Sequence, residues 1–146
     1  MNTFTAQQLL PALQPWVLAA EDDENDFFCL RRAISKATKG ILLIRAADGS
    51  QAMHFLQESL GQLPMLIITD LSMPGIDGFG LLAWVRANSQ MEKVPVFVWT
   101  ASEQPKDREK AKALAAHAYH PKGVTHSGLA GLMADFQSLL PLTAAL

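Results

Sequence analysis

The stretch "LIITDLSMPGIDG", which runs from Leu66 to Gly78, decides the fold. Its first three residues are apolar without alternation, and the run ends on the charged Asp70, followed by the turn residues Pro74 and Gly75. A continuous apolar run is typical of a parallel strand whose two faces are both covered. The stretch therefore predicts a buried strand that delivers an acid to the carboxyl edge of a parallel sheet.

The same pattern recurs along the chain, where short apolar runs alternate with segments of helical periodicity. The expected strands are Trp16–Ala20, Ile41–Ala46, Met65–Thr69, Val94–Trp99 and a weaker Ala118–His120. The expected helices are Glu24–Thr38, Ser50–Leu60, Asp77–Ala87, Ser102–Ala116 and Thr125–Leu140. Strand and helix alternate five times, which predicts a (βα)5 α/β fold with a parallel sheet between two helical layers.

The chain has 146 residues, of which 49% are hydrophobic and 18% charged, with a net charge of −2. This length and composition predict one globular domain. We expect it over residues 15–146, with residues 1–14, which precede the first expected strand, as an accessory tail. The charge offers no basic field for nucleic acid or an anionic membrane. No apolar run is long enough to span a bilayer, and the start has no signal-peptide pattern. The single Cys29 fits a reducing compartment, so we expect a cytoplasmic protein.

Polar side chains follow four of the expected strands. They are Glu21, Asp22 and Asp23 after the first, Asp70 after the third, Thr100 after the fourth and Lys122 after the fifth. Because the carboxyl ends of parallel strands share one edge of the sheet, we expect these groups to meet there. Crowded carboxylates need a cation, and Mg²⁺ prefers oxygen ligands. With a lysine and a hydroxyl nearby, the set suits a carboxylate that receives a phosphoryl group.

Each of these residues also has a structural explanation when it is taken alone. Asp70 could be a helix cap, Thr100 a strand-end hydroxyl bonded to the backbone, Tyr119 a packing residue and Lys122 a solvated surface lysine. Either Asp22 or Asp23 could cap the first helix. Core positions are expected for Trp84 and Trp99, and the histidines, which have no metal-ligand spacing, are assigned no catalytic role: His54, His117, His120 and His126.

Four segments resemble the receiver domain of two-component response regulators across about residues 16–140: "VLAAEDDEND", "LIITDLSMPGIDG", "VPVFVWTAS" and "AYHPKG". The resemblance implies a flavodoxin-like three-layer sandwich with strand order 2-1-3-4-5. It also implies that Asp70 is the phosphoacceptor, that Glu21, Asp22, Asp70 and the backbone carbonyl of Ser72 hold Mg²⁺, and that Lys122 contacts the phosphoryl group. The acidic run after the first strand begins with Glu21, which is similar to small single-domain regulators, some of which serve phytochrome-type sensor kinases.

The resemblance further implies that Thr100 and Tyr119 form a switch pair that reshapes the face of the fourth helix, fifth strand and fifth helix. The fourth helix, Ser102–Ala116, has few apolar residues to hold it against the sheet, so we expect it to be the mobile element. The family usually has Lys-Pro with a cis bond at the lysine, whereas this chain has Pro121-Lys122-Gly123, so the sequence leaves the geometry of the turn open.

The implied partner is a sensor histidine kinase or a histidine phosphotransfer protein, and homodimerisation through the same face is a further expectation. The alternative function is a Mg²⁺-dependent phosphohydrolase with Asp70 as nucleophile. Such an enzyme commonly needs a general acid two residues further on, where this chain has Ser72. A flavin carrier is a third hypothesis, but three consecutive acids after the first strand would repel its phosphate.

Overall fold

The computed structural model describes residues 14–140, and it confirms the (βα)5 fold. The strands are β1 (Trp16–Ala20), β2 (Leu42–Ala46), β3 (Leu66–Thr69), β4 (Val96–Thr100) and β5 (Ala118–Pro121). The helices are α2 (Glu24–Ala37), α3 (Gly49–Glu58), α4 (Gly78–Ala87), α5 (Pro105–Ala113), the 3₁₀ turn η1 (Val124–His126) and α6 (Leu129–Ser138). The tail expected at 1–14 lies, except for its last residue, outside the described residues.

The five strands form one sheet of order β2-β1-β3-β4-β5, in which every neighbouring pair is parallel. This is the flavodoxin-like order that the resemblance implied. Strand order reverses between β1 and β3, where Ala20 is in register with Thr69. The next backbone bond, from the Asp70 N–H to the Ala20 carbonyl, has a length of 3.0 Å. The residues that follow β1 and β3 are therefore neighbours at the point where open α/β sheets bind ligands.

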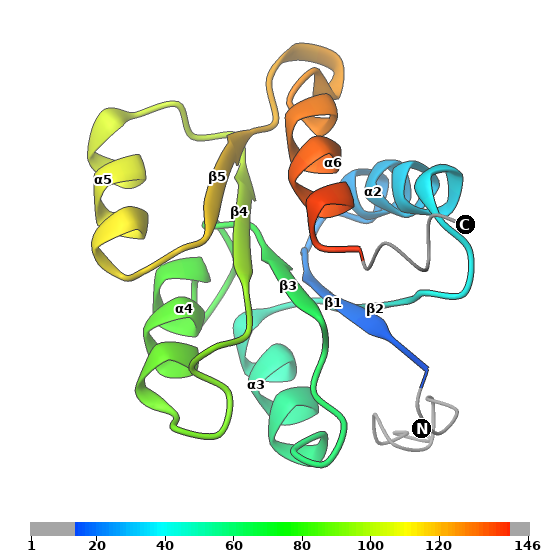
Figure 1. The fold of residues 1–146 in the computed structure, drawn as a ribbon. Coiled ribbons are helices and arrows are strands. Elements are labelled where there is room, and N and C mark those ends of the chain that lie inside the picture. The colour runs from blue at the N-terminus through cyan, green and yellow to red at the C-terminus, as the bar shows by residue number, and fades with distance from the viewer. Residues whose placement is uncertain (1–13, 141–146) are drawn as a thin grey trace.

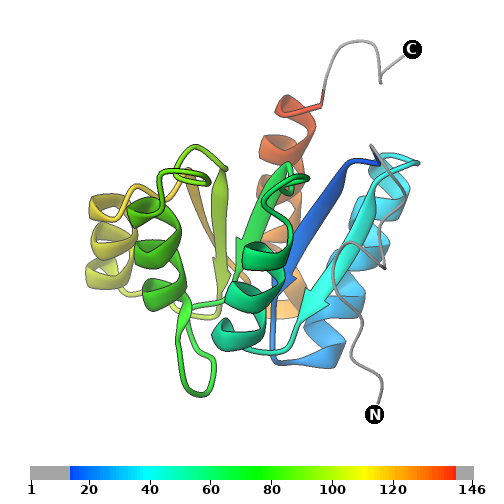
Figure 2. The same cartoon turned by 90° about the horizontal axis from the view of Figure 1, so that it is seen from below.

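Both faces of the sheet are covered, as the continuous apolar runs predicted (Figures 1 and 2). One apolar cluster joins Leu18 and Ile67 of the sheet to α3 and α4, and the other joins Val17 and Phe97 to α2 and α6. Trp99 is buried in the second cluster and Trp84 packs against the first, which confirms the packing role expected of both. The sheet residues thus alternate between two helical layers.

Helix α5 is the least anchored helix of the described chain. It is shorter than the expected Ser102–Ala116, because Pro105 begins it and Ala115 adopts a positive φ of 64° just beyond its end. Proline suits the first helical turn, where its missing N–H is not needed. Ala111 is the buried residue of α5, so little apolar surface holds this helix to the sheet.

The segment between β5 and α6 differs from the expectation of a helix over Thr125–Leu140. The structure has the short turn η1 there, and α6 begins only at Leu129. His126 has a positive φ of 60°, which interrupts helical geometry. Gly128 then packs so closely that a Cβ atom would lie 1.6 Å from the Pro121 carbonyl oxygen. In the described part of the chain, no helix is long and apolar enough to cross a membrane.

Candidate functional site

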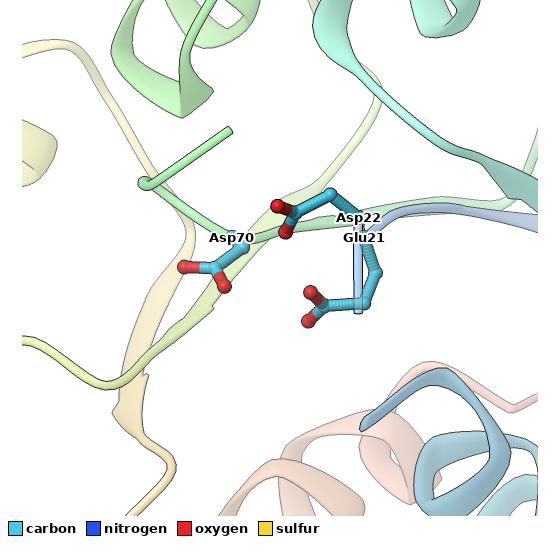
Figure 3. A group of neighbouring side chains, drawn as sticks. All are labelled: Glu21, Asp22 and Asp70. Carbon is cyan, nitrogen blue, oxygen red and sulfur yellow. The ribbon is translucent and has the colours of Figure 1, made fainter. Parts of the chain in front are cut away.

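Three carboxylates gather at the ends of β1 and β3 (Figure 3). Glu21, Asp22 and Asp70 each offer one carboxylate oxygen, and these oxygens lie within 4.8 Å of one another. Glu21 is 2% exposed and Asp70 is 7% exposed, whereas Asp22 faces solvent. The side chains expected to surround a cation are therefore brought together, with an open side towards water.

The loop after β3 fixes the carboxylate of Asp70. Its Oδ1 atom accepts hydrogen bonds from the backbone N–H groups of Leu71 at 2.7 Å and Ser72 at 3.3 Å. The start of α4 packs directly on this loop, because a Cβ atom on Gly78 would lie 2.1 Å from the Asp70 carbonyl oxygen. Gly75 has a positive φ of 74° and makes the turn. Of the two glycines, Gly75 is therefore needed for its backbone conformation and Gly78 for close approach.

Lys122 reaches the same place from the end of β5. Its Nζ atom donates to Glu21 Oε1 at 2.7 Å, to Asp26 Oδ2 at 2.6 Å and to Asp70 Oδ2 at 2.8 Å, and the residue is only 7% exposed. The ammonium also lies 4.8 Å from the centroid of the Trp99 ring. Burial opposes the charge, but the hydrogen bonds to Asp26, Asp70 and Glu21 raise the pKa of Lys122 above its ordinary value. Lys122 is therefore a fixed cation within the acidic group.

The turn that the sequence left open positions this lysine with trans peptide bonds. No cis peptide bond occurs among residues 14–140. The Lys122 N–H donates to the Thr100 carbonyl at 2.6 Å, and the Lys122 carbonyl accepts from the Gly128 N–H at 3.1 Å. Gly123 supplies a positive φ of 70°. Pairing with β4 and this glycine turn direct Lys122 into the site without a Lys-Pro bond.

Glu21 carries the least favourable charge of the site. Burial raises the pKa of Glu21 from its ordinary value of 4.5 to about 7, although the hydrogen bond from Lys122 acts in the opposite direction. The repulsion from Asp70 adds to the effect of burial. A divalent cation between these oxygens would supply the missing positive charge, and an all-oxygen set of this kind suits a hard ion. The residues therefore fit a divalent metal site.

A cavity of about 380 Å³ opens beside Asp70 and is bordered by Ser72, Thr100 and Ser102. Thr100 is buried, and its hydroxyl accepts a hydrogen bond from the Ser102 N–H at 3.3 Å. The Tyr119 hydroxyl donates to the Ser102 carbonyl at 2.9 Å. The two residues expected to form a switch pair are thus linked through one residue, Ser102, at the edge of this cavity.

Two residues at the site were missed by the sequence analysis. Asp26 lies in the first turn of α2 and binds Lys122, and His126 Nε2 binds Asp26 Oδ1 at 2.6 Å. Its place in the first turn of α2, next to the acidic residues that follow β1, could have indicated Asp26. His126 had no such indication. Asp23 proves to be the helix cap, because its side chain accepts from the Asp26 N–H at 2.9 Å, and it is exposed to solvent.

The sequence matches the family described as the response regulator receiver domain over residues 17–133, and the chain belongs to this family. The response regulator Rcp1 of Synechocystis sp. is 32% identical over 111 residues, which cover 73% of this chain and 75% of Rcp1.

Solved structures agree with this assignment. The Mn²⁺-bound form of Rcp1 superposes with a TM-score of 0.73 at 28% identity, covering 89% of this chain and 94% of that one. The bacteriophytochrome response regulator RtBRR has a TM-score of 0.70 at 28% identity, covering 84% of this chain and 78% of its own. The acidic group of Glu21, Asp22 and Asp70 is consistent with the phosphorylation site of a receiver domain.

Proposed function

We propose that this protein is the phosphoacceptor of a two-component phosphorelay and that Asp70 receives the phosphoryl group. The donor would be the phosphohistidine of a sensor histidine kinase or of a histidine phosphotransfer protein. The observation that carries the proposal is the convergence of Glu21, Asp22 and Lys122 on Asp70 from three separate parts of the chain. The similarity to RtBRR, which is described as a bacteriophytochrome response regulator, supports a photoreceptor kinase as the class of donor.

The metal of this reaction would be Mg²⁺, held by the carboxylates of Glu21, Asp22 and Asp70 together with the backbone carbonyl of Ser72. When bound, such an ion neutralises charge on the transferring phosphoryl oxygens. The Mn²⁺-bound form of the relative Rcp1 supports a divalent ion of this kind. The raised pKa of Glu21, at about 7 because of burial, supports it independently.

In the transfer, a carboxylate oxygen of Asp70 attacks phosphorus while the P–N bond of the phosphohistidine breaks. The Lys122 ammonium, 2.8 Å from Asp70 Oδ2, is placed to pair with a phosphoryl oxygen. The Thr100 hydroxyl borders the same cavity, where its oxygen accepts from the Ser102 N–H, and its O–H can donate to another phosphoryl oxygen when the side chain turns towards it. Positioning and charge neutralisation account for most of the catalysis of phosphoryl transfer.

The output of the proposed switch is a change in the surface formed by α5, β5 and α6. When Thr100 turns, Tyr119 fills the space it leaves, and Tyr119 must then release the Ser102 carbonyl. Its ring also leaves the guanidinium of Arg108, whose Cζ atom lies 4.6 Å from the ring centroid. Since α5 buries little apolar surface, it can adjust at low cost. This surface is also the proposed site of homodimerisation.

A signalling role is favoured over the alternative, a Mg²⁺-dependent phosphohydrolase. Such an enzyme needs a general acid for its leaving group, and the position two residues after Asp70 is Ser72. We therefore propose that Asp70 is phosphorylated without turnover of external phosphoesters. A flavin carrier is opposed by the buried negative charge of Glu21 and Asp70.

The test is labelling by acetyl phosphate and Mg²⁺, followed by intact mass spectrometry. Wild type should gain one phosphoryl group and Asp70→Asn should gain none. The matched control is Asp77→Asn, because Asp77 borders the same cavity and asparagine caps α4 as well as aspartate does. Labelling of Asp70→Asn, or loss of labelling in Asp77→Asn alone, would refute the assignment. Steady hydrolysis of p-nitrophenyl phosphate would instead favour the phosphohydrolase.

A further inference from the structure

Lys122 has three acidic partners, and only two of them belong to the group that can hold a metal. Glu21 and Asp70 offer oxygens to that group, whereas Asp26 does not. Asp26 nevertheless makes the shortest of the three bonds to the lysine, at 2.6 Å against 2.7 Å and 2.8 Å. The ammonium therefore lies between the metal ligands on one side and a separate carboxylate of α2 on the other.

Asp26 is itself held in place by His126. Burial opposes the charge of Asp26, but hydrogen bonds from His126 and Lys122 lower the pKa of this carboxyl below its ordinary value. An ionised carboxylate can only accept, so the proton between Asp26 Oδ1 and His126 Nε2 belongs to the imidazole. The histidine ring packs on Trp99, with the ring centroids 5.8 Å apart. Each oxygen of Asp26 thus has one fixed donor.

His126 lies in the turn that follows Lys122, so the pair connects this turn to α2. The sequence separation of Asp26 and His126 is 100 residues. In this chain the turn has trans peptide bonds and a glycine, and it is fixed by the bond between the Lys122 carbonyl and the Gly128 N–H. The bond from His126 to Asp26 adds a side-chain link on the side of the turn that faces α2.

A divalent cation and the Lys122 ammonium require the same carboxylates. A cation bound by Glu21 and Asp70 draws on the same two carboxylates to which Lys122 donates its hydrogen bonds. Lys122 loses part of its charge compensation at that moment, and a buried ammonium without partners is strongly disfavoured. Asp26 is the partner that does not take part in this competition.

We propose that Asp26, held by His126, is a positioning residue for Lys122 that keeps the ammonium beside Asp70 when a divalent cation takes Glu21. The inference rests on the proposed function, since it concerns the lysine expected to pair with the phosphoryl group. In this role Asp26 and His126 together set the balance between Lys122 and a divalent cation at the carboxylates of the site. A link that only joins α2 to the turn would stabilise the fold without changing this balance.

The first experiment measures Mg²⁺ binding to the full chain by tryptophan fluorescence, because Trp99 lies beside both Lys122 and His126. Asp26→Asn keeps an acceptor oxygen but loses the charge, so it should weaken Mg²⁺ binding by about fivefold or more, which corresponds to about 1 kcal/mol. The matched control is Glu24→Gln, which removes one negative charge from the exposed side of the same helix and should change binding by less than about twofold. Equal effects of the two variants would overturn the proposal.

The second experiment asks whether Asp26 acts through the lysine. In a Lys122→Met background, Asp26→Asn should change the Mg²⁺ dissociation constant by less than about twofold, since the residue it positions is gone. The same fivefold effect in both backgrounds would overturn the proposal. His126→Leu should weaken Mg²⁺ binding by about two- to threefold, while His126→Gln keeps an N–H donor for Asp26 and should restore it. Failure of glutamine to rescue would exclude His126 from the role.

These outcomes are separable from failure of the proposed function. If wild type neither binds Mg²⁺ nor accepts phosphate from acetyl phosphate, the proposed function itself is wrong. If wild type does both and Asp26→Asn binds Mg²⁺ as wild type does, the proposed function stands and the inference about Asp26 is wrong. Urea unfolding of each variant in EDTA shows whether weak Mg²⁺ binding results simply from a loss of folding.

Discussion

Replacing Glu21 with glutamine should raise the unfolding free energy of the metal-free protein above that of wild type, and by more at high pH than at low pH. Burial holds the pKa of Glu21 at about 7, against an ordinary value of 4.5. The folded state therefore binds this proton more tightly than the unfolded state. The stabilisation that results is complete below about pH 4.5 and is lost as the pH rises to about 7. Glutamine resembles the protonated carboxyl in shape and does not titrate, so Glu21→Gln lacks this loss.

The magnitude follows from the distance between the two pKa values. At about 1.36 kcal/mol per pKa unit, a rise from 4.5 to about 7 corresponds to about 3 kcal/mol at pH 8. At pH 5 the same relation gives a destabilisation of less than about 1 kcal/mol from the charge on Glu21. The difference in unfolding free energy between Glu21→Gln and wild type should therefore grow by about 2 kcal/mol from pH 5 to pH 8, in favour of the variant. The substitution also alters the hydrogen bond that residue 21 accepts from the Asp23 N–H, but this change is present at both pH values and therefore cancels when the two are compared.

Urea unfolding in EDTA at the two pH values measures this difference directly. Glu24→Gln serves as the control, because its side chain is 75% exposed, and it should alter the unfolding free energy by no more than about 0.5 kcal/mol. Parallel pH dependences for wild type and Glu21→Gln would refute the reasoning, since they would mean that burial does not disfavour the Glu21 charge. The variant should also bind Mg²⁺ less tightly than wild type does.

Three further predictions follow from the same geometry. Gly78→Ala should destabilise the protein by more than about 2 kcal/mol in urea unfolding, because the added Cβ atom would lie 2.1 Å from the Asp70 carbonyl oxygen. A loss of unfolding free energy under about 0.5 kcal/mol would contradict this. Mg²⁺ affinity should increase with pH up to about 7, where Glu21 loses its proton, and then level off, whereas a constant affinity from pH 5 to 8 would contradict it. Tyr119→Phe should cost about 1 kcal/mol through loss of the bond to Ser102, and unchanged thermal stability would show that this bond is replaced by water.

The sequence contained enough information for the fold and for the acidic group. Uninterrupted apolar runs such as residues 66–68 of β3 indicate that both sheet faces are covered, and parallel strands necessarily bring their carboxyl ends to one edge. The residues that directly follow such runs, Glu21 and Asp70, could therefore be placed together from their positions alone. Lys122 could be placed at the same edge because it follows β5 directly.

The remaining features depend on backbone geometry that periodicity does not describe. His126 lies in a segment that was expected to belong to one helix over Thr125–Leu140, yet its positive φ interrupts helical geometry and its ring binds Asp26 of α2. Its contact with Asp26 joins residues that no local pattern relates. The need for glycine at position 78 is likewise a matter of tertiary approach to the Asp70 carbonyl.

The central claim is tested most directly by locating the phosphoryl group on the chain. Wild type is incubated with Mg²⁺ and acetyl phosphate, reduced with borohydride to convert an acyl phosphate to homoserine, and mapped by peptide mass spectrometry. The account predicts conversion at Asp70 and at no other acid. Conversion at Asp22 or Asp77, or none at Asp70 in protein that binds Mg²⁺, would contradict it.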